Sequence, residues 1–214
     1  MRPHLRNLGI LAALFLGLAA SGEAAAQATG IDTKAATAER VLGNADAPIT
    51  IVEYAALTCP HCAEFHEKIL PGIKKDFIDN GQVKIVFRDY PFEKNGLAAA
   101  MMARCVSPER FFAVQGMIFK SQKTWLTAQD PMAELQKVGR FAGISPQQFE
   151  SCMANKELQD AVIQSRFEAE KKHRVNSTPT FIINDGKARV EGAKEQELRD
   201  ALVKLGAKPA TAAK

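Results

Sequence analysis

Long hydrophobic runs, internal repeats and a strong charge of either sign are all absent from this chain of 214 residues. Its one extended apolar run, residues 8–20, is shorter than the roughly 20 residues that a membrane-spanning helix requires. A formal net charge of +4 does not indicate a nucleic-acid-binding protein. No repeat of fixed period is present. What remains is enough sequence for one domain with a substantial core.

The first 26 residues have the three parts of a secretory signal peptide. Arg2 and Arg6 precede the apolar run, and the small residues 24–26 follow it. We therefore expect export and cleavage after Ala26, with an uncleaved N-terminal membrane anchor as the alternative. Lipid attachment is not expected there, because no cysteine follows the apolar run.

The first part of the exported chain predicts a β-α-β unit. Residues 49–54 are β-branched and aromatic and follow a proline, which indicates a strand. Residues 60–77 place apolar side chains four residues apart and end at an Asn-Gly pair, which indicates an amphipathic helix. Residues 83–88 resemble a buried strand, so the two strands are expected to be parallel.

A helical pattern follows, and strand character then returns. Residues 180–183 and 188–191 are separated by an Asn-Asp-Gly turn, which predicts a hairpin, and a helix is expected over 195–205. The fold class is therefore α/β, β-α-β then β-β-α, with a helical insertion. The divisions are a signal peptide (1–26), a flexible segment (27–40), a first half (41–95), an inserted helical subdomain (96–173), a second half (174–206) and a flexible tail (207–214).

All four cysteines lie in the exported part, and two of them are separated by only two residues. The Cys59-Pro60-His61-Cys62 motif lies between a predicted strand and a predicted helix, which is the context of a redox-active pair. Free N–H groups and the dipole at the helix start favour a thiolate on Cys59. Cys59 is therefore expected to attack, and Cys62, one turn into the helix, to resolve the mixed disulfide.

The two residues between these cysteines are expected to tune the thiolate. Pro60 and His61 are these two residues, and the protonatable ring of His61 adds electrostatic attraction for the Cys59 thiolate. A stabilised thiolate stabilises the reduced form, and a stabilised reduced form makes the disulfide the stronger oxidant. This favours an oxidase that donates disulfides to newly exported proteins.

Two other interpretations of the short motif are a structural disulfide and half of a zinc site. Zinc would need two more ligands, and His66 and His173 do not form a second closely spaced pair. His66 falls four residues after Cys62, so it can approach the site, but a solvent-facing position on the helix is the expectation.

Four segments together resemble the DsbA-like branch of the thioredoxin superfamily. They are residues 41–48, the strand end at Glu53-Tyr54, the Cys-Pro-His-Cys motif and residues 178–181, and the similarity covers nearly all of 41–205. The resemblance implies a thioredoxin fold in two halves, with the helical insertion that plain thioredoxins lack.

The resemblance also implies roles for three further residues. Pro179 fills the position of a cis-proline packed against the disulfide, and the backbone of Thr178 would pair with an extended substrate. A trans proline opening an edge strand is the alternative. Glu53 matches a buried acid that exchanges a proton with the second cysteine, although a strand-edge acid can also face solvent. His66 stands where the best-known members carry an acid.

Cys105 and Cys152 both fall in the predicted helical insertion, 47 residues apart and outside any short motif. In an exported protein a structural disulfide is the default expectation, and two free thiols are the alternative. Closing a loop of this length can stabilise the fold by up to about 4 kcal/mol.

The resemblance implies a monomeric periplasmic oxidase that acts on unfolded exported proteins with free cysteines and is recycled by a DsbB-type, quinone-linked membrane oxidase. No metal or cofactor is expected beyond the Cys59-Cys62 disulfide, and no nucleic-acid partner. A disulfide isomerase or reductase is the alternative within this fold; the short stretch before Val41 argues against a large oligomerisation module, and a short trimerising helix stays open. A metal-binding module using Cys59, Cys62 and His61, or an adhesion role with incidental thiols, are the alternatives outside it.

Overall fold

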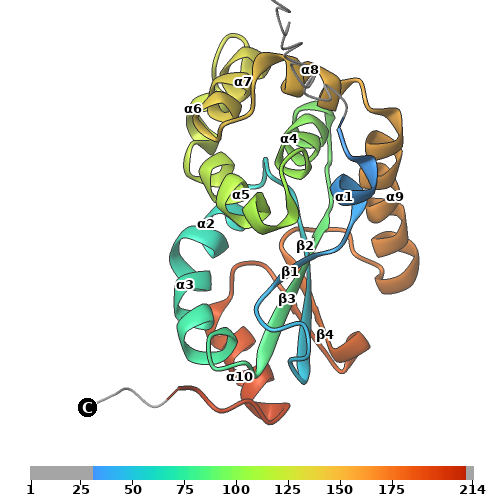
Figure 1. Cartoon of the computed structure of the whole chain (residues 1–214). Helices are drawn as coiled ribbons and strands as arrows, with labels where there is room; N and C mark the ends of the chain where they lie inside the picture. The colour runs from blue at the N-terminus through green and yellow to red at the C-terminus, as the bar shows by residue number, and fades with distance from the viewer. Residues whose placement is uncertain (1–30, 211–214) are drawn as a thin grey trace, which may run out of the picture.

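Five strands form one mixed sheet in the order β1-β3-β2-β4-β5 (Figure 1). The computed structural model describes residues 31–210. The strands are β1 (Arg40–Leu42), β2 (Ile49–Ala55), β3 (Val83–Asp89), β4 (Thr180–Ile183) and β5 (Ala188–Glu191). The helices are α1 (Thr33–Thr37), α2 (Pro60–Glu64), α3 (Leu70–Ile73), α4 (Lys94–Arg104), α5 (Phe111–Lys120), α6 (Gln122–Leu126), α7 (Pro131–Phe141), α8 (Pro146–Met153), α9 (Lys156–His173) and α10 (Glu195–Lys204).

The predicted β-α-β unit is present and occupies the centre of the sheet. β2 and β3 are parallel, and residues 60–78 connect them as one helical stretch that contains α2, α3 and two π-helical turns. β4 lies on the other side of β2 and is antiparallel to it, so β2 has a neighbour on both sides. This register places Glu53 of β2 between Phe87 of β3 and Phe181 of β4.

The helical insertion forms a second lobe above the sheet (Figure 1). α4 runs through this lobe, α5 to α8 surround it, and α9 returns beside the sheet to β4. Its core is apolar and aromatic, and it is continuous with the buried face of α2. α8 begins as predicted: Ser145 forms a capping box with Gln148, and Pro146 takes the first helical position.

The segment expected to be flexible, 27–40, is ordered where the structure describes it. Asp32 caps α1 by accepting a hydrogen bond from the Ala35 N–H, and Arg40 at the start of β1 is 1% exposed. β1 then pairs with β3 in antiparallel orientation. The prediction missed this because the contacts that order a five-residue helix come from distant parts of the chain.

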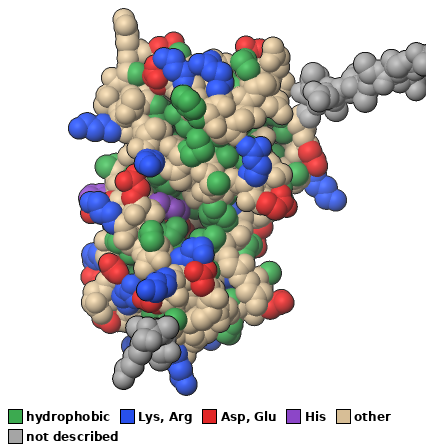
Figure 2. All heavy atoms as spheres, turned by 60° about the vertical axis from the view of Figure 1, so that its left-hand side comes forward, with side chains coloured by type: hydrophobic (Ala, Val, Ile, Leu, Met, Phe, Trp, Pro, Cys, Tyr) green, Lys and Arg blue, Asp and Glu red, His purple; other side chains and the backbone are tan. Residues whose placement is uncertain are grey.

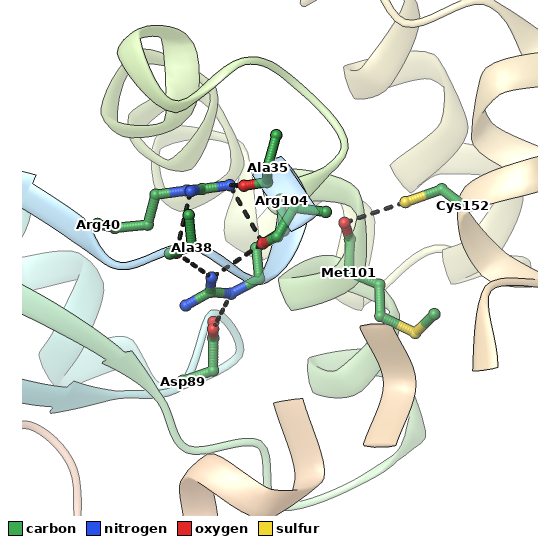
Figure 3. A network of polar contacts seen from close by, with 8 residues as sticks. Ala35, Ala38, Arg40, Asp89, Met101, Arg104 and Cys152 are labelled. Carbon is green, nitrogen blue, oxygen red and sulfur yellow. Dashed lines mark hydrogen bonds and ion pairs between the residues drawn. The ribbon is translucent and has the colours of Figure 1, made fainter. Parts of the chain in front are cut away.

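Those contacts are made by two buried arginines (Figure 3). Arg40 donates hydrogen bonds to three backbone carbonyls in and after α1, and Arg104 of α4 donates to the carbonyls of Ala36 and Ala38. Arg104 also forms an ion pair with Asp89 at the end of β3. Burial, followed by the nearby charge of Arg104, lowers the pKa of Arg40 to about 10. The carbonyls that α1 leaves unpaired are therefore satisfied by charged donors.

A disulfide joins Cys105, just after α4, to Cys152 in α8. Cys152 is fully buried, and its Sγ lies 3.1 Å from the carbonyl oxygen of Met101 (Figure 3). The bond therefore links two helices of the insertion at the edge of the arginine network.

The expected flexible tail, 207–214, is partly packed in the structure. Ala207 is buried, and the Ala210 N–H donates a hydrogen bond to the carbonyl of Asp76. Gln82 additionally holds the backbone of Lys208 through two hydrogen bonds. The expectation was thus wrong for residues 207–210. Residues 211–214 and the predicted signal peptide lie outside the described residues. Between residues 31 and 210, no helix combines the length and hydrophobicity needed to cross a membrane.

Candidate active site

Two thiols lie at the start of α2, and the fold places them in different environments. Cys59 is the residue that precedes the first turn, with Pro60 at the first helical position, and its side chain is partly exposed. Cys62 is one turn further and is 0% exposed. The backbone N–H groups of Cys62 and Ala63 both donate to the Cys59 carbonyl. Both thiols are free in this structure.

The Cys59 thiol is acidic. A hydrogen bond from the Cys62 side chain is the largest cause, and with Thr178 and the backbone N–H groups of Cys62 and His61 it outweighs burial and lowers the pKa of Cys59 to about 5. The Cys59 Sγ lies 3.3 Å from the Thr178 carbonyl oxygen, which accepts a hydrogen bond from the thiol before ionisation. Once Cys59 is ionised, its thiolate accepts hydrogen bonds from the Cys62 thiol and from the backbone N–H groups of Cys62 and His61.

The Cys62 thiol is shifted in the opposite direction. Burial, then the hydrogen bond and charge of Cys59, then the charge of Glu53 raise the pKa of Cys62 well above its ordinary value. Near neutral pH, Cys59 is therefore the thiolate and Cys62 the thiol that donates to it. This division is that of an attacking and a resolving cysteine.

His61 contributes differently from the expectation. Its imidazole is 69% exposed, and Nδ1 lies 3.6 Å from Oε2 of Glu64, one turn along the helix. The contribution of His61 to the low pKa of Cys59 comes from its backbone N–H. The ring is directed along the helix because a neighbouring carboxylate provides a partner there.

The loop before β4 lies against the two cysteines, although about 120 residues separate them in sequence. The Thr178–Pro179 peptide bond is cis, an isomer that the sequence alone leaves open. The Pro179 carbonyl accepts a hydrogen bond from the Gly192 N–H, 2.8 Å away, after β5. The fold therefore places the Thr178 backbone beside Cys59.

Glu53 is buried, and His66 is its partner. Glu53 is 0% exposed on β2, and its Oε1 lies 2.8 Å from Nε2 of His66. The expectation that His66 faces solvent was wrong, because its side chain is only 6% exposed. The helix widens into a π-helical turn at Phe65–Ile69, and the ring stacks on Phe119, with centroids 4.6 Å apart. A buried carboxylate requires a polar partner, and this histidine provides it.

A family model for thioredoxin matches residues 35–204 of this chain. The chain belongs to the thioredoxin family. Within that family, the chain is similar to proteins of the DsbA-like branch. The crystal structure of α-DsbA1 from Wolbachia pipientis superposes on it with a TM-score of 0.71 at 30% identity, covering 78% of this chain and 90% of that one.

Curated relatives agree with this placement. Disulfide bond formation protein D of Bacillus subtilis is 31% identical over 153 residues, which are 68% of this chain and 67% of the relative. A candidate protein-disulfide oxidoreductase of Rickettsia bellii is 31% identical over 147 residues. That alignment covers 68% of this chain but only 57% of the Rickettsia protein.

One residue of this DsbA-like site was missed by sequence reasoning. The side-chain amide of Gln122, at the start of α6, donates to the carbonyls of Leu57 and Cys59 at 2.9 and 3.0 Å. The glutamine is buried, and it connects the helical insertion to the loop that carries Cys59. Nothing in the local sequence indicates this role, because its partners are more than 60 residues away.

The structure thus brings together Cys59, Cys62, Glu53, Thr178 and Pro179. The Cys105–Cys152 disulfide is not part of this group: Cys152 packs in a separate apolar cluster, whereas Cys62 packs in the core of the insertion. Residues 31–210 contain no group of three or more His, Cys, Asp or Glu side chains arranged to hold a metal ion.

Figure 2 brings forward the side of the molecule on which α2 and α3 lie. Histidine reaches the surface at about mid-height, and hydrophobic side chains lie beside and above it. Lysine, arginine and acidic side chains are interspersed over the rest of this face, without one dominant sign. Such a surface suits contact with apolar segments of another chain more than contact with a polyanion.

Proposed function

We propose that this DsbA-like protein is a thiol:disulfide oxidase that introduces disulfides into exported proteins through the Cys59–Cys62 pair. The observation that carries the proposal is the opposite shift of the two thiols. The pKa of Cys59 is lowered to about 5, whereas that of Cys62 is raised well above its ordinary value. Stabilising the Cys59 thiolate stabilises the reduced protein. Reduction of the Cys59–Cys62 disulfide by a substrate is therefore favourable, which makes this disulfide an oxidant.

The reaction has two exchange steps. A substrate thiolate attacks Sγ of Cys59, the Cys59–Cys62 bond breaks, and its electron pair goes to Cys62, which takes a proton from the carboxylic acid of Glu53. A second substrate thiolate then attacks the substrate sulfur of the mixed disulfide, and Cys59 leaves as the stabilised thiolate. The substrate loses two electrons to form one disulfide, and the pair Cys59 and Cys62 is reduced.

The substrates are unfolded chains with free cysteines. The backbone of Thr178 lies beside Cys59, and in this proposal a substrate segment pairs with it as an added strand. Such pairing uses main-chain groups, so it is tolerant of substrate sequence.

Repeated turnover requires an oxidant, and we place the protein in the periplasm with a DsbB-type, quinone-linked membrane oxidase as that partner. The name of the Bacillus subtilis relative, disulfide bond formation protein D, supports an oxidising role. The predicted signal peptide supports export.

The direction of the reaction is tested by mixing oxidised protein with a reduced, unfolded protein that contains two cysteines. We expect stoichiometric loss of substrate thiols within seconds to minutes at pH 7, and no loss with Cys59→Ser. Fast reduction of insulin disulfides together with no oxidation of the unfolded substrate would contradict the proposal and favour a reductase or isomerase.

A further inference from the structure

The buried carboxylate of Glu53 is only half satisfied. Its Oε1 lies 2.8 Å from Nε2 of His66, whereas Oε2 is buried and has no hydrogen-bond partner among the described residues. An unsatisfied carboxylate oxygen inside a protein is costly, so it is retained only where something else uses it. This carboxylate acts electrostatically on Cys62, because the charge of Glu53 contributes to the raised pKa of Cys62.

The ring of His66 is held in one orientation by aromatic contacts. It stacks on Phe119 of α5 with an interplanar angle of 26°, and it meets Phe65 and Phe87 edge-on with centroids 5.3 and 6.2 Å away. α5 and β3 therefore present phenyl rings to the pair. The charge of Glu53 acts on Cys62, which in turn hydrogen-bonds to Cys59. Among the described residues, the hydrogen-bond partner of His66 Nε2 is Oε1 of Glu53.

We propose that His66 is a positioning residue, which holds Oε1 of Glu53 so that Oε2 remains free to exchange a proton with Cys62. The inference rests on the proposed function. In it, Glu53 exchanges protons with Cys62 efficiently only while His66 holds its carboxylate in place. The described hydrogen bond of His66 goes to Glu53 and not to either sulfur atom.

The proton balance shows where the histidine acts. When Cys62 leaves the disulfide with its electron pair, the Glu53 carboxylic acid transfers its proton from Oε2 to the Cys62 sulfur. The resulting buried carboxylate keeps its hydrogen bond to His66, which compensates the new charge. During reoxidation the proton returns from Cys62 to Oε2, and the Cys62 thiolate attacks Cys59 of the mixed disulfide, whose bond to the partner sulfur breaks and releases that sulfur as a thiolate. No other proton carrier is needed inside the pocket.

The matched variants are His66→Gln and His66→Asn. The side-chain nitrogen of glutamine reaches the place of the imidazole Nε2, whereas that of asparagine reaches only the place of Nδ1, so glutamine alone can keep a donor on Glu53. The reduced protein is mixed with excess oxidised glutathione in a stopped-flow instrument over a range of pH. The first phase reports attack by Cys59, and the second reports attack by Cys62 on the mixed disulfide.

We expect His66→Asn to slow the second phase by about tenfold or more and to change its pH profile, while the first phase stays within about twofold. His66→Gln should remain within about threefold of the wild type in both phases. In a Glu53→Gln background, His66→Asn should have no additional effect, because the histidine acts only through the carboxylate.

Equal slowing of both phases by His66→Asn, an unchanged second phase, or an effect that persists with Glu53→Gln would overturn the inference. A His66→Asn protein that does not fold leaves His66→Gln as the test: a tenfold slower second phase in folded His66→Gln would also overturn it. Failure of the wild type to exchange with glutathione would contradict the proposed function instead, so the two failures are distinguishable.

Discussion

The two cysteine pairs of this chain have the same functional groups in very different surroundings. Cys59 lies at a helix start, partly exposed, with hydrogen-bond donors around its sulfur. Cys152 is completely buried among apolar side chains and is bonded to Cys105, 47 residues away. Reactivity follows from whether the surroundings can stabilise a thiolate and admit a second sulfur, and only the first pair meets both conditions.

The largest difference between the two pairs should be seen when one sulfur is removed from each. Cys59→Ser should slow disulfide exchange with an unfolded substrate by about a thousandfold or more, because no thiolate remains to carry the mixed disulfide. Cys105→Ser should change the rate by less than about threefold, because this pair lies outside the site. Comparable losses of rate in the two variants would show that the pairs are not functionally distinct.

The second pair should instead be visible in stability. The double variant Cys105→Ala/Cys152→Ala should unfold in urea with a free energy lower by about 2–4 kcal/mol, because the cross-link no longer restricts the unfolded chain. The thiolate absorbance of Cys59 serves as the control and should not move. An unchanged free energy of unfolding would remove the structural role assigned to this bond.

The ionisation of Cys59 should make the free energy of unfolding depend on pH in the reduced protein but not in the oxidised protein. Because the pKa of Cys59 falls from an ordinary thiol value to about 5 on folding, its stabilisation is complete above the pKa of the unfolded thiol and is lost as pH falls through 5. Cys62, whose pKa is raised, stays protonated throughout this range.

The free energy of unfolding of the reduced protein should rise by about 1–2 kcal/mol between pH 5 and pH 7, a value that is reduced to allow for the partial exposure of Cys59. Urea unfolding of the reduced and oxidised forms at several pH values measures it, with the oxidised form as the control because it has no thiol to ionise. A difference between the two forms that is constant from pH 5 to pH 8 would refute the assigned shift.

The smallest effect concerns the connection between the two lobes. Gln122→Ala removes one buried and one partly buried hydrogen bond to the loop that carries Cys59 and should lower the free energy of unfolding by about 1–2 kcal/mol. Gln196→Ala, on the exposed face of α10, should change it by less than about 0.5 kcal/mol. Equal effects of the two substitutions would mean that Gln122 does not connect the insertion to the site.

Local patterns predicted most of the sheet and the position of Cys59 at a helix start. The strand at 49–54, the helix after Cys59 and the hairpin at 184–186 depend on residues close together in sequence, and the structure contains all three. Cys59 was identified for the same reason, because a helix start supplies its environment from within a few residues.

The missed features depend on distant contacts. α1 and β1 are ordered by Arg104, which is more than 60 residues away in sequence. His66 was expected to face solvent, although it falls four residues after Cys62; it lies in a π-helical turn and its side chain contacts Glu53 on the neighbouring strand. Gln122 reaches Cys59 from the insertion. The sequence pattern of one segment does not show which residues of a distant segment will pack against it.

The account depends most directly on the separation of the two thiols in pKa. Reduced wild-type protein should be titrated while the thiolate absorbance near 240 nm is followed. We predict one ionisation near pH 5 from Cys59 and a second well above pH 9 from Cys62, with Cys62→Ala raising the first midpoint because it removes the largest hydrogen bond to the thiolate. A single transition of both thiols near pH 8.5–9, the range of an ordinary cysteine, would contradict the account.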